Sequence, residues 1–100
     1  MLSRLLQPEI QSLIEERQLG ILKEILLDWT PADIAELLVD LPEKDRVIIF
    51  RLLSKELAAD TFEYMDFDTQ MELLKLMGKE ESAVILNEMD PDDRTALFEE

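Results

Sequence analysis

The pattern that decides the fold stands in residues 83–98, AVILNEMDPDDRTALF. It predicts one helix that ends at Met89 and a second helix that begins at Asp90. The Asp90 carboxylate can accept hydrogen bonds from the free N–H groups of the next turn, which makes it a good N-cap. Pro91 then takes the first helical position, where a missing N–H costs nothing. Asp92 and Asp93 fall in the first turn, where the helix dipole favours negative charge.

The same pattern occurs three times at a spacing of 24 residues. Its equivalent positions are Ala35, Leu38, Leu41, Pro42, Arg46 and Phe50, then Ala59, Phe62, Met65, Asp66, Gln70 and Leu74, then Ala83, Leu86, Met89, Asp90, Arg94 and Phe98. A unit of two short helices cannot bury its apolar face alone, so such units stack on one another. The sequence therefore predicts an all-α solenoid of about eight short helices, and the repeat itself leaves the hand of its twist open.

Each predicted helix carries one apolar stripe. The first, residues 1–17, is expected to restart at Pro8 and to end at Gln18–Gly20. Thr30, Pro42, Ser54 and Asp66 are expected to start helices, and Gly78 is expected to stop one as a left-handed terminus. The residues expected to face the core are Leu6, Ile10, Leu13, Ile14, Ile21, Leu22, Ile25, Leu26, Ile34, Leu37, Leu38, Leu41, Ile49, Phe50, Leu53, Leu57, Ala58, Thr61, Phe62, Met65, Met71, Leu74, Met77, Ala83, Leu86, Met89, Leu97 and Phe98.

The charge balance limits the possible partners. The 100 residues contain 24 acidic and 10 basic side chains, for a net charge of −14. Nucleic acid and anionic membrane surfaces both call for a basic patch, so this composition disfavours them. Divalent cations and basic protein surfaces are its natural complements. A hydrophobic share of 47% is typical of a folded globular chain, and the length suits one domain, 1–100. No apolar run reaches the roughly 20 residues of a membrane span.

The residue types that are missing argue against an enzyme. The chain has no Cys and no His, which removes the thiolate nucleophile, the commonest general base and the Ser-His-Asp class of sites. Gly20 and Gly78 are too far apart to form a phosphate-binding loop. The acidic turns at Asp66 and Asp90 lack the Gly and Glu that an EF-hand calcium loop needs at its sixth and twelfth positions. We therefore expect no catalytic activity.

Three segments of the chain resemble a known family. They are TPADIAELL at residues 30–38, LPEKDR at 41–46 and ILNEMDPDDR at 85–94. Together they look like the cytosolic N domain of MgtE-type magnesium transporters, and the resemblance covers the chain from about Ile10 onward. It implies a right-handed, armadillo-like superhelix that is soluble as an isolated domain. In a transporter, this domain would lie at the cytoplasmic face of the cell membrane.

The resemblance also implies a function. In that family, acidic residues of the N domain and of the neighbouring CBS domains share Mg²⁺ when Mg²⁺ is abundant, and the closed assembly shuts the pore. By position in the repeat, Asp60 and Asp92 match acids of the N domain, and Asp93 is adjacent to the second. The implied ligand is a weakly bound, shared Mg²⁺, and the implied partners are CBS domains of the same transporter.

The expected assembly is a homodimeric transporter, with the isolated chain monomeric. CBS and membrane domains do not follow within this chain. Two positions depart from the family pattern. Ala96 stands where some members carry a further acid in the final helix, and Thr30 stands where many carry His.

The residues also allow a second interpretation, a helical-repeat adaptor without a metal role, similar to the armadillo domains of the flagellar motor-switch protein. An adaptor binds a partner helix through an exposed apolar groove, whereas a sensor presents acidic faces. We expect Phe67 to be exposed in the turn between Asp66 and Asp68, and it is the one residue that we assign to an adaptor patch. A titration with Mg²⁺ or Ca²⁺, set against a partner pull-down, separates the two interpretations.

Overall fold

Seven helices make up the part of the chain that a computed structural model describes, residues 2–89, with side chains described from Leu6 onward. They are α1 (Leu2–Glu15), α2 (Leu19–Leu26), α3 (Pro31–Asp40), α4 (Glu43–Leu52), α5 (Lys55–Glu63), α6 (Phe67–Met77) and α7 (Lys79–Glu88). No strand occurs between residues 2 and 89, so the all-α prediction is confirmed there. The helix expected to begin at Asp90, with its core residues Leu97 and Phe98, lies outside the described residues.

From α2 onward, helices begin at a constant spacing of twelve residues. The first residues are Leu19, Pro31, Glu43, Lys55, Phe67 and Lys79, so each pair of helices spans 24 residues and the predicted repeat is confirmed. Three predicted N-caps form the expected side-chain bonds. Thr30 Oγ1 accepts from Asp33 N at 3.2 Å, Ser54 Oγ from Leu57 N at 3.2 Å and Asp66 Oδ1 from Thr69 N at 2.8 Å.

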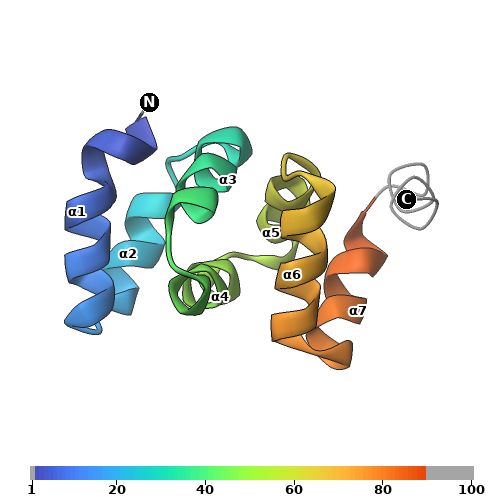
Figure 1. Cartoon of the computed structure of the whole chain (residues 1–100). Helices are drawn as coiled ribbons and strands as arrows, with labels where there is room; N and C mark the ends of the chain where they lie inside the picture. The colour runs from blue at the N-terminus through green and yellow to red at the C-terminus, as the bar shows by residue number, and fades with distance from the viewer. Residues whose placement is uncertain (1, 90–100) are drawn as a thin grey trace.

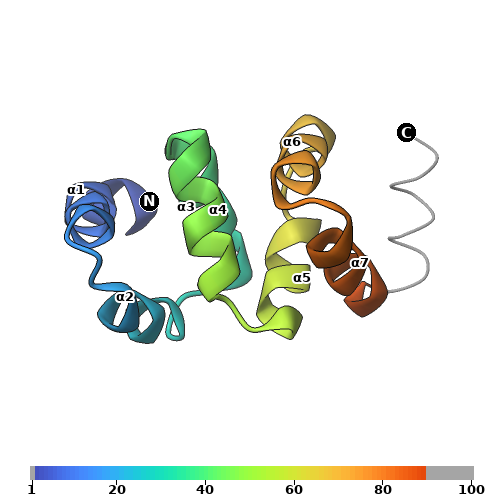
Figure 2. The ribbon, with the colours of Figure 1, turned by 90° about the horizontal axis from the view of Figure 1, so that it is seen from below.

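The helices follow one another along the long axis of the molecule, from α1 and α2 at one end to α7 at the other (Figures 1 and 2). The molecule measures 38 × 27 × 21 Å. Among the odd-numbered helices, each packs against the next: α1 against α3, α3 against α5, and α5 against α7. The even-numbered α4 packs against α6 in the same way. Apart from α2, which packs against α1, every helix thus packs against the helix two places away in the chain.

The core runs through the whole stack. Its fully buried side chains include Ile10, Leu22, Leu26, Ile34, Leu37, Leu38, Leu41, Ile49, Phe62 and Leu73. Most of these residues were expected from the spacing of apolar positions. The rings of Phe50 and Phe62, each the eighth residue of its helix, meet at a centroid distance of 6.3 Å and an interplanar angle of 59°. This tilted contact joins α4 to α5 inside the core.

Two expected helix boundaries are wrong. The α1 helix continues through Pro8 instead of restarting there, and the break after it lies at Glu16–Gln18 rather than at Gln18–Gly20. Arg17 adopts φ 60° and takes the position that glycine usually occupies after a helix. The amide of Gln18 closes this turn on Leu13 O at 2.9 Å. Gly20 is therefore free to sit inside α2. Gly78 ends α6 as expected, with φ 86°, although its ψ of 176° lies outside the left-handed helical region.

The core stripe also differs from expectation at a few positions. Ile21 and Ala83 are exposed. The side of α2 that faces the core carries Leu22 and Leu26 instead, and the side of α7 that faces the core carries Ile85. Met71, Leu74 and Leu86 are only partly buried against the core. In α6 the fully buried position is Leu73, which the spacing argument missed because Met71 and Leu74 fit the same periodicity.

Candidate functional site

Negative charge gathers on α3 and α5, which pack against each other. The α3 helix contains Asp33, Glu36 and Asp40 and no basic residue, and α5 has a single base, Lys55, at its first position. Glu36 and Asp60 are 24 residues apart and so hold the same place in successive repeats. Both side chains are exposed. The repeat thus sets one carboxylate on each of two neighbouring helices at equivalent positions.

A groove of about 400 Å³ runs beside these acids, between α3 and the turn that joins α5 to α6. We call it the acidic groove; it is lined by Ala32, Ala35, Glu36, Val39, Asp40, Tyr64, Met65 and Asp66. Among the described residues, three carboxylates and no basic side chain border it. Asp60 lies one helical turn before Tyr64 on α5, and residues four apart share a helix face. Asp60 therefore stands next to the acidic groove without lining it.

Basic side chains of the later helices are engaged in ion pairs between repeats. Arg46 Nη1 lies 3.0 Å from Glu72 Oε1, Arg51 Nη2 lies 2.8 Å from Glu81 Oε1, and Lys55 Nζ lies 3.6 Å from Glu88 Oε1. These pairs join α4 to α6, α4 to α7 and α5 to α7, respectively. Their positive charge is thereby held by acids of α6 and α7. Within the described residues, no hydrogen bond or ion pair holds Asp60.

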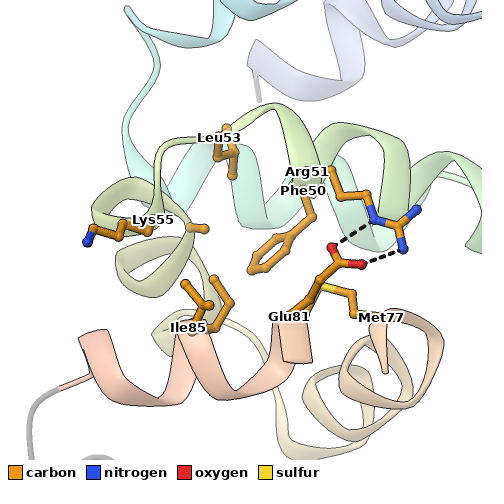
Figure 3. A pocket seen from close by; sticks show the side chains of 9 residues that line it. Phe50, Arg51, Leu53, Lys55, Met77, Glu81 and Ile85 are labelled. Carbon is orange, nitrogen blue, oxygen red and sulfur yellow. Dashed lines mark hydrogen bonds and ion pairs between the residues drawn. The ribbon is translucent and has the colours of Figure 1, made fainter. Parts of the chain in front are cut away.

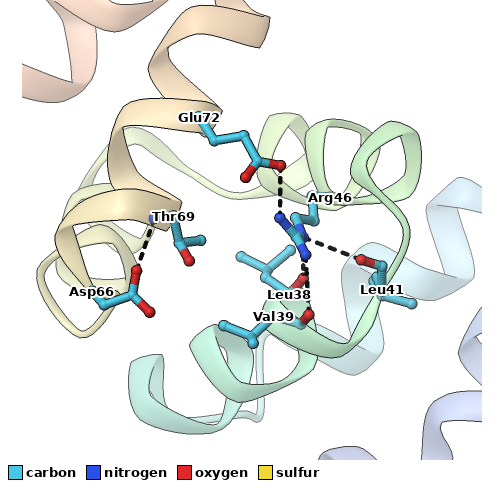
Figure 4. A network of polar contacts seen from close by, with 7 residues as sticks. All are labelled: Leu38, Val39, Leu41, Arg46, Asp66, Thr69 and Glu72. Atoms are coloured by element: carbon cyan, nitrogen blue, oxygen red, sulfur yellow. Dashed lines mark hydrogen bonds and ion pairs between the residues drawn. The ribbon is translucent and has the colours of Figure 1, made fainter.

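Arg46 is the centre of a polar network between α3, α4 and α6 (Figure 4). Its Nε donates to Leu38 O at 2.7 Å and to Leu41 O at 3.1 Å, and its Nη2 donates to Val39 O at 3.1 Å. These carbonyls belong to the last turn of α3 and to its C-cap, where main-chain oxygens lack helical partners. The guanidinium therefore closes the end of α3 while it binds Glu72 of α6.

Two carboxyl groups near this network have shifted pKa values. The bond from Thr69 to the Asp66 carboxylate favours its charged form and lowers the pKa of Asp66. Glu43, close to Glu72, raises the pKa of Glu72 by hydrogen bonding and by its negative charge, and this outweighs the opposing effect of Arg46. Acidic groups thus crowd together at the α4–α6 contact despite the guanidinium between them.

The structure places only one of the three predicted metal ligands. Asp60 is on the exposed face of α5, whereas Asp92 and Asp93 lie outside the described residues. Between residues 2 and 89 no three carboxylates come close enough to hold a metal ion together. The expected adaptor residue, Phe67, is wrong in its placement: it is half-buried and packs against the core as the first residue of α6.

A family model described as the MgtE intracellular N domain matches residues 29–100. The chain belongs to this family. The match confirms the resemblance noted in the sequence, but it begins at Trp29, so α1 and α2 lie outside it. A search of curated proteins found no match to the chain. Among the helices described for this MgtE N domain, none combines the length and the apolar character that crossing a membrane requires.

Neither the acidic groove nor the Arg46 network of this MgtE N domain was predicted from the sequence. A signal for the network was present, because the repeat aligns Arg46 with Gln70, so a polar side chain recurs at this position. A polar side chain that recurs in such a place usually satisfies a main-chain group. Nothing comparable pointed to the groove, since it depends on how the exposed ends of α3 and α5 meet.

Proposed function

We propose that this chain is the Mg²⁺-sensing element of a MgtE-type magnesium transporter. Its acidic surface, with Asp60 on α5 and with Asp92 and Asp93 beyond the described helices, would share Mg²⁺ with CBS domains of the same transporter. In this role the chain is regulatory and not catalytic. The observation that carries the proposal is the placement of Asp60 in a chain of this family: it is an exposed carboxylate beside the acidic groove, and no residue between 2 and 89 pairs with it.

The available donors fit Mg²⁺. This ion keeps several of its waters and is usually bound through one or two carboxylates. Asp60 can offer its carboxylate without breaking a contact to any described residue. It lies on α5, and Glu36 holds the equivalent repeat position on α3, which packs against α5. Because three acids do not converge anywhere in residues 2–89, the described surface supplies part of a coordination shell. A second domain would have to supply the rest.

The negative charge of the domain explains why Mg²⁺ would favour closure. With a net charge of −14, its acidic face repels another acidic domain that approaches within a Debye length, about 8 Å at physiological ionic strength. Bound Mg²⁺ would neutralise the two facing surfaces. Asp60 then favours the closed arrangement, in which the N domain packs against the CBS domains, only when the ion is present. A ligand that binds one of two conformations more tightly shifts the population toward it by its difference in affinity.

The proposal includes the setting of the domain. It would lie at the cytoplasmic face of the cell membrane as part of a homodimeric transporter, and the isolated chain would be a monomer. The finer architecture is also proposed: the stack of helices is a right-handed, armadillo-like superhelix. The packing of each odd-numbered helix against the next odd-numbered helix supports a solenoid.

A Mg²⁺ titration of the isolated chain, followed by amide NMR shifts, tests the binding surface. We expect weak, saturable shifts that centre on α5 around Asp60 and on the facing part of α3. Asp60→Asn should remove the saturable component, whereas Asp28→Asn, which removes an exposed acid from the turn after α2, should leave it unchanged. Shifts spread evenly over all acidic residues, and equal in both variants, would contradict the proposed role of Asp60.

A further inference from the structure

A second hollow of the molecule lies at the junction of α4, α5, the end of α6 and α7 (Figure 3). We call it the α4–α7 cavity. Its volume is about 490 Å³, and its apolar lining consists of Phe50, Leu53, Ala58, Met77, Val84 and Ile85. It opens to solvent, since Val84 is 48% exposed. Asp60, the described acid assigned to Mg²⁺ sensing, does not line it, and neither does any residue of the acidic groove.

The repeat explains why this space is available. Leu53 and Ala58 occupy the positions that Trp29 and Ile34 hold 24 residues earlier. Trp29 is 7% exposed and Ile34 is 0% exposed, so these larger side chains are buried in the core. At the α4–α7 cavity these two positions carry the smaller Leu53 and Ala58, which fill less of the space next to them. The preceding repeat thus indicates what the fold accommodates at this kind of junction, namely a bulky aromatic ring.

Two basic side chains and one acid stand at the rim of the α4–α7 cavity. Arg51 binds Glu81 through two bonds, Nη2 to Oε1 at 2.8 Å and Nε to Oε2 at 2.9 Å, beside the opening (Figure 3). Lys55 is 59% exposed, and its ammonium is 3.6 Å from Glu88. An exposed ion pair of this kind contributes little, so Lys55 can turn toward a ligand at small cost. Because Arg51 is already held by Glu81, the loosely paired Lys55 ammonium is the positive charge that this rim offers to an anion.

We propose that the α4–α7 cavity binds a small molecule that joins an aromatic ring to a carboxylate. The ring enters between Phe50, Met77 and Ile85, and the carboxylate lies at the rim beside Lys55 and Arg51. The cavity has the size of typical small-molecule sites, about 300–1,000 Å³, with a mostly apolar wall and a few polar groups that orient the ligand.

An NMR titration of the full chain with 3-indolepropionate tests this proposal. We expect saturable shifts of the Met77 and Ile85 methyl groups, and nuclear Overhauser effects from the indole protons to these methyls. Ala58→Ile introduces the side chain that the preceding repeat has at this position and should abolish the binding. Ala83→Ile, the same change at an exposed position of α7, is the matched control and should leave the binding unchanged.

The charge at the rim has its own test. Lys55→Gln should weaken 3-indolepropionate binding about twofold to fivefold, as expected for the loss of an exposed ion pair, and Lys75→Gln on α6 should not. The neutral 3-indolepropionamide should bind the parent chain more weakly by a similar factor. Equal binding of acid and amide would overturn the assignment of a carboxylate ligand. Absence of indole-to-methyl contacts in the parent chain would overturn the site itself, and this measurement does not depend on the folding of any variant. Unchanged binding in Ala58→Ile would also overturn the site.

Discussion

Arg46 and Gln70 hold the same position in successive repeats, and each donates to the main-chain oxygen eight residues before it. Arg46 Nε lies 2.7 Å from Leu38 O, and Gln70 Nε2 lies 2.8 Å from Phe62 O. In both places the amide three residues after the acceptor donates to the same oxygen, Leu41 N at 3.3 Å and Met65 N at 3.1 Å. In both repeats, a side chain of the following helix thus donates to a carbonyl oxygen at the C-terminal end of the preceding helix.

This shared role predicts a graded response at Arg46. Arg46→Ala should lower the free energy of unfolding by about 1.5–3 kcal/mol, since hydrogen bonds to a charged donor are lost. Arg46→Gln should lose less, because Gln70 shows that an amide can make the bond to the carbonyl. Urea denaturation measures both changes, with Lys44→Ala, an exposed position of the same helix, as the control. Equal losses for the Ala and Gln variants would show that the bond to Leu38 O contributes nothing.

Truncating Phe62 should cost more stability than truncating Leu86, because the two side chains differ in burial. Phe62 is fully buried against Phe50, so Phe62→Ala should lower the free energy of unfolding by about 3–5 kcal/mol. Leu86 is only partly buried, and Leu86→Ala should cost about 1–2 kcal/mol, because less apolar area is lost. Denaturant melts of the two variants measure this. A loss at Leu86 as large as that at Phe62 would contradict the observed orientation of α7.

The contact between Glu43 and Glu72 predicts a pH-dependent gain in stability. Glu72 has a raised pKa in the folded state, so its charged form costs stability near neutral pH, and this cost disappears as the pH falls through the folded pKa. Glu43→Gln removes the main cause of the shift. The variant should be more stable than the parent at about pH 7, and the gain should shrink toward about pH 4, where carboxyl groups become protonated.

The control for this prediction is Glu56→Gln, which removes an acid from the first turn of α5 as Glu43→Gln does from α4. It accounts for the lost helix-dipole interaction. NMR titration of the Glu72 carboxyl should show a lower pKa in Glu43→Gln than in the parent chain. An unchanged pKa of Glu72, or the same pH-dependent gain in Glu56→Gln, would rule out Glu43 as the cause.

Much of the helical stack could be predicted from the sequence because local signals and the repeat agreed. Thr30, Ser54 and Asp66 cap helices as expected, and the 24-residue spacing matches the observed helix starts. The failures have physical causes. Arg17 can adopt a positive φ, so the break before α2 did not need Gly20. Met71, Leu73 and Leu74 all fit a helical stripe, and tertiary packing chose Leu73.

The candidate site was less predictable than the fold. The exposure of Asp60 follows from the periodicity of α5, but its place beside the acidic groove depends on how α3 meets the α5–α6 turn. Phe67 lies at the start of a helix, where a residue can turn either outward or toward the core, and here it packs against the core. The sequence position of such a residue does not settle its exposure. Asp92 and Asp93, outside the described helices, stay predictions.

The most direct test of the sensor role measures closure as a function of Mg²⁺ in a MgtE-type transporter whose N domain is this chain. The readout is protease protection of the linker between the N domain and the CBS domains. Asp60→Ala combined with Asp92→Ala should shift the protection midpoint to higher Mg²⁺, while Asp28→Ala should not. Asp28 and Asp60 are exposed, so their substitutions should leave the fold nearly unchanged. An unchanged midpoint in the double variant would contradict the account and remove both residues from the sensor.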